Sequence, residues 1–102
     1  MKYLLHFKPR QGMSHEHAIA AAERGLQLFE KWAPPQGVTI HQFVTSFDVT
    51  SGGWIIFETD DLSVLMEDAN VFGMFNEQSI IPVMDIQDAV PYEQRALGRL
   101  RS

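Results

Sequence analysis

The sequence predicts a single α+β domain in which helices cover one face of an antiparallel β-sheet. Three observations lead to this fold class. Four β-prone segments and two amphipathic helical segments follow one another in the order βαββαβ. The chain has 102 residues, which is enough for one hydrophobic core and too few for two. Hydrophobic residues make up 45% of it and charged residues 21%, as in an ordinary folded protein.

The first strand and the first helix are predicted from the residues that precede a double proline. Tyr3–Lys8 is a β-prone run and is expected to form the first strand. Ser14 stands in the N-cap position of the next helix, with Glu16 in its first turn. The apolar stripe of this helix consists of Ile19, Ala22, Leu26, Phe29 and Trp32 or Ala33. Gly25 suggests close packing against the sheet, and Pro34-Pro35 ends the helix.

A β-hairpin is predicted next. The long strand Val38–Phe47 alternates between two sides, with Val38, Ile40, Gln42 and Val44 on one and Thr39, His41, Phe43, Thr45 and Phe47 on the other. Both sides carry apolar residues, so we expect this strand to be buried on two faces. The turn residues Asp48–Gly53 join it to a third strand over Trp54–Glu58.

A second helix and a fourth strand complete the pattern. Thr59-Asp60-Asp61 is a helix-start signal, and Gly73 suits the C-terminal end of the helix. Its stripe is Leu62, Leu65, Met66, Ala69 and Phe72. Ser79–Ile86 is the fourth strand, and Pro82, which lacks a backbone donor, places it at a sheet edge. The tail from Gln87 is expected to form a short helix or to fray.

The element order specifies the topology. With right-handed crossovers, βαββαβ gives the strand order 4-1-3-2 with both helices on one face, the ferredoxin-like sandwich. We assign this domain to residues 1–88 and the C-terminal tail to residues 89–102. The uncovered face would carry some of Leu4, Phe43, Trp54, Ile56 and Met84 or their alternates. Such a face is too apolar to meet water, so a second sheet or a ligand should cover it.

Four short motifs carry a resemblance to a known family. They are Lys2-Tyr3-Leu4, Pro34-Pro35-Gln36-Gly37-Val38, Glu58-Thr59-Asp60-Asp61-Leu62 and Ile81-Pro82-Val83-Met84-Asp85. Together they resemble the uncharacterised domain-of-unknown-function family 3303 over roughly residues 1–88. The resemblance implies a dimeric α+β barrel, in which two ferredoxin-like protomers close their sheets around a small lumen. It supplies no catalytic residues, and the wider superfamily includes cofactor-free monooxygenases, haem-degrading enzymes, isomerases and lyases.

The candidate site lies on the face that would line such a lumen. His6, His41 and Glu58 are the candidates for proton transfer, and an apolar lumen would raise the pKa of Glu58 by desolvation. The candidate ligand-binding residues are Trp54, Phe43, Leu4 and Met84. Four of these residues have a structural alternative: a solvated strand end for His6 and Glu58, an interfacial or solvated position for His41, and burial at the dimer interface for Trp54.

Composition argues against several classes of function. A net charge of −5 repels phosphate backbones and anionic membranes, so we expect neither a nucleic-acid nor a membrane partner. With no cysteine, the chain has no disulfide and no thiolate nucleophile. His15-Glu16-His17 lacks the i, i+4 spacing of a helical zinc motif, so a polar first turn is favoured over a surface metal site. We expect no metal and no cofactor. The N-terminal apolar run is too short for a signal peptide, and a cytoplasmic location is expected.

Two hypotheses of function follow. The first is a homodimer that binds an apolar or aromatic small molecule between its sheets, with cofactor-independent oxygenase or isomerase chemistry. The second is a non-catalytic dimerisation or regulatory module whose sheet interface is filled by side chains. A void with a converging His/Glu pair favours the first, and a close-packed interface favours the second.

Overall fold

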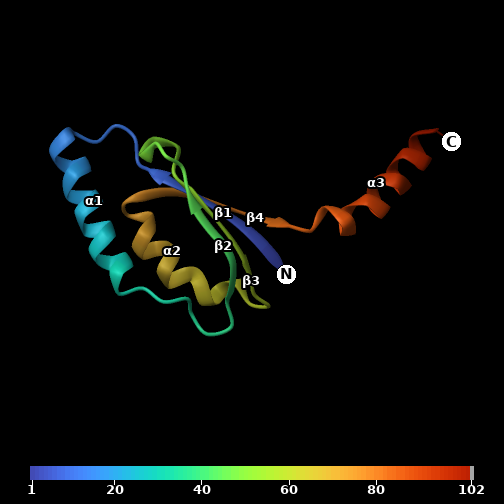
Figure 1. The fold of residues 1–102 in the computed structure, drawn as a ribbon, viewed down its shortest axis with the longest axis horizontal. Helices are drawn as coiled ribbons and strands as arrows, with labels where there is room; N and C mark the ends of the chain where they lie inside the picture. The colour runs from blue at the N-terminus through green and yellow to red at the C-terminus, as the bar shows by residue number, and fades with distance from the viewer. Residues whose placement is uncertain (102) are drawn as a thin grey trace.

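The strands form one antiparallel sheet in the order β2-β3-β1-β4 (Figure 1). This computed structural model describes residues 1–101. The strands are β1 (Lys2–Pro9), β2 (Thr39–Thr45), β3 (Gly53–Glu58) and β4 (Asn76–Val83), and the helices are α1 (His15–Glu30), α2 (Met66–Gly73) and α3 (Ile86–Arg101). Short 3₁₀ turns, η1 (Val49–Ser51) and η2 (Leu62–Leu65), precede β3 and α2. The predicted α+β class, element order and strand order are confirmed.

Helix α1 begins where the sequence predicts. The Ser14 hydroxyl accepts a hydrogen bond from the backbone N–H of His17 at 3.2 Å, which satisfies one free donor of the first turn. The helix does not pack closely against the sheet, however. A Cβ added at Gly25 would meet no atom within 4 Å, so the expected close packing at this glycine was wrong. Instead, the Trp32 indole just after the helix donates to Asp68 of α2 at 2.9 Å.

Side-chain hydrogen bonds hold the turn before α2 and the end of α2, which itself begins at Met66 without a side-chain cap. Asp61 caps the preceding turn η2 by accepting from the backbone N–H of Ser63 at 3.0 Å. At the other end, the Arg10 guanidinium donates twice to the carbonyl of Gly73, with distances of 3.0 and 2.6 Å. A cation on this carbonyl also complements the negative end of the helix dipole. The loop after β1 is thereby attached to α2.

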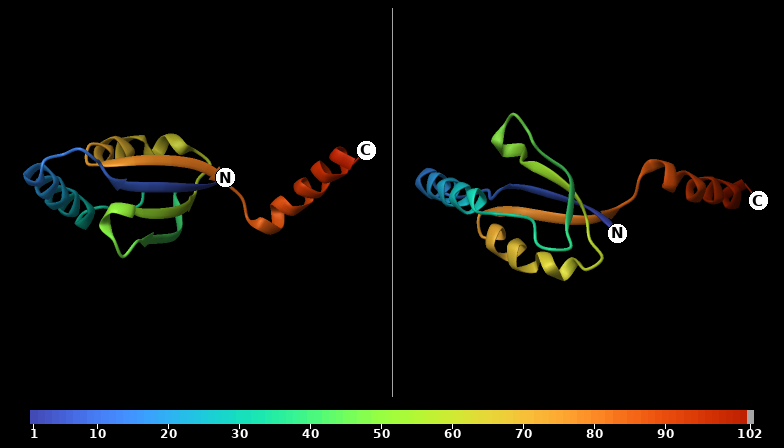
Figure 2. Two further views of the ribbon diagram at one scale, coloured as in Figure 1. Left: turned by 90° about the horizontal axis from the view of Figure 1, so that it is seen from above. Right: turned by 60° about the horizontal axis from the view of Figure 1, so that its bottom comes forward.

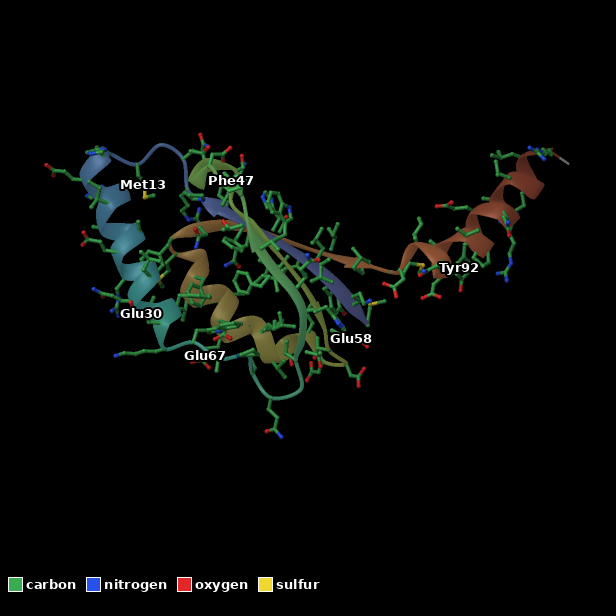
Figure 3. All side chains as sticks on the ribbon, in the orientation of Figure 1. Met13, Glu30, Phe47, Glu58, Glu67 and Tyr92 are labelled. Atoms are coloured by element: carbon green, nitrogen blue, oxygen red, sulfur yellow. The ribbon has the colours of Figure 1, made fainter. Side chains whose placement is uncertain are left out.

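A β-bulge in β2 changes the predicted alternation. Ile40 pairs with Phe57 and Gln42 pairs with Ile56, so His41 is an extra residue between them. The bulge brings Ile40 and Phe43 to the helix-covered face although their numbers differ by three. The expectation that His41 and Phe43 share a side was therefore wrong. The strand also ends at Thr45, and Phe47 lies in the turn, fully exposed (Figure 3).

Strand β4 lies at a sheet edge, which confirms the position inferred from Pro82. It begins and ends three residues before the predicted limits, because Asn76, Glu77 and Gln78 extend the ladder opposite Pro9, Lys8 and Phe7 of β1. The chain then leaves the sheet as α3, a helix of 16 residues. Figures 1 and 2 show this helix projecting away from the sheet and from the other two helices.

The interior of the domain is thinly filled. Phe57 is 2% exposed and is the one buried hydrophobic side chain among those the structure describes. It stacks on Tyr3 with ring centroids 5.5 Å apart. None of the helices within residues 1–101 has the length and apolar character that crossing a membrane requires.

Candidate functional site

A small cavity of about 330 Å³ opens on the sheet face that no helix covers. Its floor is apolar and comes from the centre of the sheet, with Leu4 paired to Ile56. Polar and charged groups surround this floor at the end of the sheet where β1 begins. The residues that line the cavity are Lys2, Leu4, His41, Gln42, Ile56, Val83, Met84 and Asp85.

His41 and Glu58 form a hydrogen-bonded pair beside this cavity. His41, the extra residue of the bulge in β2, lies next to Glu58, the last residue of β3. The distance between His41 Nε2 and Glu58 Oε1 is 2.9 Å. This hydrogen bond lowers the pKa of Glu58 from its ordinary value of 4.5, and it outweighs the opposing effect of desolvation. The expected rise in the pKa of Glu58 was therefore wrong.

The charge on Glu58 determines the tautomer of His41. An ionised carboxylate can only accept hydrogen bonds, so Nε2 of His41 must carry the proton in this pair. In the neutral ring, Nδ1 then keeps its lone pair and can accept a proton. A carboxylate that orients an imidazole in this way is a common arrangement for a general base.

A charged pair borders the same cavity and was not predicted from the sequence. The Lys2 ammonium lies 2.8 Å from Oδ1 of Asp85, just after β4. The contact raises the pKa of Lys2 and lowers that of Asp85. Lys2 also pairs across the ladder with Glu58. The alternation of Lys2 with Leu4 and His6 along β1 was the signal that could have placed Lys2 on this face.

His6 lies on the same face but away from the pair. Its ring stacks on Trp54 with centroids 4.9 Å apart, and its Nε2 lies 3.0 Å from the carbonyl oxygen of Ser51. Lys2, the cross-strand partner of Glu58, is four residues from His6, a separation of roughly 13 Å along a strand. The structure therefore brings His41 and Glu58 together and leaves His6 at the opposite end.

The predicted ligand-binding residues do not all lie at the cavity. Leu4 and Met84 line the cavity, whereas Trp54 lies beside His6 at the far end of the face. Phe43 is on the other side of the sheet. There its ring makes edge-to-face contacts with Phe7 and Phe29, at 5.9 and 5.6 Å between centroids. Its expected position on the uncovered face was wrong, because the bulge shifts the alternation of β2 before Phe43.

A larger cavity of about 660 Å³ lies between the sheet and the helices α1 and α2. Its lining is almost entirely apolar and includes small residues of α1, among them Ala18, Ala22 and Gly25. The hydrogen-bonded pair of Trp32 and Asp68 borders it, but this pair has no imidazole that could accept a proton. This cavity reflects the distance of α1 from the sheet, and it offers less chemistry than the smaller one.

The family of the chain follows from its similarity to known proteins. A model of the domain-of-unknown-function family DUF3303 matches residues 1–97. The chain belongs to the DUF3303 family. The resemblance inferred from the sequence motifs is confirmed. The DUF3303 match extends beyond residue 88 and includes most of α3. No curated protein matches the chain. For this DUF3303 protein, any activity has to be argued from its own geometry.

Proposed function

We propose that the protein is a homodimer that binds a small apolar or aromatic molecule on the uncovered sheet face and transfers a proton to or from it. The observation that carries the proposal is the hydrogen-bonded pair of His41 and Glu58 beside an apolar cavity. Apolar pockets with a few convergent polar groups are the usual form of small-molecule sites. The remaining apolar side chains of the face would pack against a second copy.

In this proposal each residue has a distinct role. Leu4, Ile56 and Met84 hold the apolar body of the ligand. His41 Nδ1 accepts a proton from an acidic C–H or O–H group of the ligand, and the positive ring that forms is stabilised by the Glu58 carboxylate. Lys2 provides a cation near the negative charge left on the ligand. Isomerisation and cofactor-independent oxygenation can both start with such a step.

Native mass spectrometry of the tag-free protein tests both whether the protein is a dimer and whether it carries a bound small molecule. We expect a species of twice 11.6 kDa that carries additional mass from a bound small molecule. A dimer without added mass, together with no binding of an apolar fluorescent probe such as anilinonaphthalene sulfonate, would instead support the non-catalytic dimerisation module.

Substitution then tests the site itself. We expect the double variant His41→Ala/Glu58→Gln to lose binding of the same probe, because the polar groups beside the apolar floor are removed. The variant His15→Ala is the matched control, since His15 lies at the start of α1 and outside the cavity. Wild-type affinity in the double variant would contradict the assignment of the site.

A further inference from the structure

The cavity between the sheet and the helices α1 and α2 has room for a ligand under α1. Its volume of about 660 Å³ lies within the range of roughly 300–1,000 Å³ that is usual for small-molecule sites. On the α1 side its lining includes the small residues Ala18, Ala21, Ala22 and Gly25. A Cβ added at Gly25 would meet no atom within 4 Å. Because apolar walls without contacts lose dispersion energy, an apolar occupant would stabilise the domain.

Aromatic contacts at the C-terminal end of α1 hold this helix in its position. The rings of Phe29 and Trp32 stack with centroids 6.0 Å apart. Both meet Phe43 of β2 edge-to-face, at 5.6 and 6.4 Å between centroids. The Trp32 indole also donates to Asp68 of α2 at 2.9 Å. These contacts connect α1 to the sheet and to α2, and they form an aromatic end of the cavity.

Arg10 supplies a positive charge at the rim of the cavity, away from this aromatic end. Its side chain lines the cavity and is exposed to solvent. Two of its five N–H donors bind the carbonyl oxygen of Gly73, at the end of α2. Asp68 is five residues earlier in α2, roughly 7 Å along the helix axis. Among residues 1–101, no carboxylate forms an ion pair with Arg10, so its charge is available to a ligand.

We infer that this cavity binds an amphipathic carboxylate of the fatty-acid type. The hydrocarbon part of the ligand packs on the small residues of α1 and on sheet residues such as Ile55 and Ile80. Its carboxylate accepts charge-assisted hydrogen bonds from the remaining donors of Arg10. A singly charged group suits one guanidinium in a chain of net charge −5. This site lies on the opposite side of the sheet from His41 and Glu58 and does not depend on the proposed function.

Isothermal titration calorimetry with decanoate and with decanol tests the ligand class. We expect wild-type protein to bind decanoate at least threefold more tightly than decanol, because decanol has no charge for Arg10 to bind. Arg10→Gln keeps a donor for the carbonyl of Gly73 and should remove this preference. The control Arg24→Gln removes the same charge from α1 outside the cavity and should retain the preference. A wild type that does not bind decanoate, or that binds both compounds equally, would overturn the inference.

Substitutions at Gly25 test the location of the ligand. Gly25→Phe places a ring in the open space, and we expect it to weaken decanoate binding at least fivefold. Gly25→Ala leaves most of the space and should stay within twofold of wild type. Urea unfolding verifies that each variant folds, and if Gly25→Phe does not, the result for Arg10→Gln decides.

The other cavity provides the remaining control. His41→Ala/Glu58→Gln changes the uncovered sheet face and should bind decanoate as wild type does. Unchanged affinity in a folded Gly25→Phe variant would place the ligand elsewhere and overturn the inference. Loss of decanoate binding in His41→Ala/Glu58→Gln would likewise overturn it, because decanoate would then occupy the uncovered face.

Discussion

The proposed proton transfer depends on one pair of side chains, His41 and Glu58. Neither is buried: their side chains are 40% and 50% exposed. The hydrogen bond between them lowers the pKa of the Glu58 carboxyl group and leaves Nδ1 of His41 outside this contact. Without this pair, the histidine that remains on this face would be His6, which lies at its opposite end beside Trp54.

The lowered pKa of Glu58 predicts how stability depends on pH. The pKa in the folded protein lies below the ordinary value of 4.5, so the stabilisation is fully present above that value. It is lost as the pH falls through the lowered folded pKa. We therefore expect Glu58→Gln to flatten the acid side of the stability curve relative to wild type. Urea unfolding at a series of pH values from 7 to about 3 measures this difference.

Other carboxylates contribute equally to both curves, which isolates Glu58 in the comparison. Asp48, Asp61 and Asp85 also have lowered pKa values in the folded protein, and all three remain in the variant. If Glu58→Gln and wild type lost stability in parallel on acidification, the hydrogen bond to His41 would not exist in solution.

The hairpin between β2 and β3 is held against β1 by close backbone contact. Gly52 has φ +79°, and a Cβ at this position would collide with the carbonyl oxygen of Phe7. At Gly53 the added atom would collide with the Phe7 ring and lie 2.7 Å from the carbonyl oxygen of Val44. Helix α1 is the opposite case, because open space surrounds Gly25. The strands are therefore tightly joined, whereas α1 is not.

This contrast predicts opposite effects of the same substitution. Gly52→Ala should destabilise the fold by more than about 1 kcal/mol, because the alanine is strained and collides with β1. Gly25→Ala should stabilise it by up to about 1 kcal/mol, because helix propensity rises without a clash. Urea unfolding followed by tryptophan fluorescence measures both changes. A loss of stability in Gly25→Ala would show that α1 packs closely on the sheet in solution.

The whole molecule consists of an acidic domain and a helix that extends from it. Its dimensions are 59 × 31 × 21 Å, and α3 lies at one end of the longest axis (Figure 1). Such a shape leaves much apolar surface in contact with water in a single copy. Association would cover part of that surface without any change of fold.

The sequence alone determined the element types, their order and the strand order, because these depend on local periodicity and on the rules of strand connection. Ser14 as a helix cap and Pro82 at a sheet edge were predicted for local reasons and are confirmed. His41 and Glu58 could be named as candidates because they are chemically competent residues near strand ends. Each of these inferences used only the neighbours of a residue along the chain.

Only the tertiary structure decided how these residues meet. The bulge at His41 arises from the pairing of β2 with β3, and it moves Phe43 to the helix-covered face. The partner of His41 is 17 positions away, and the partner of Lys2 is 83 away. The start of β4 likewise depends on the length of β1 beside it. Strands pair through contacts between residues that are far apart in the sequence. The local sequence pattern therefore does not specify the register of the pairing at a bulge.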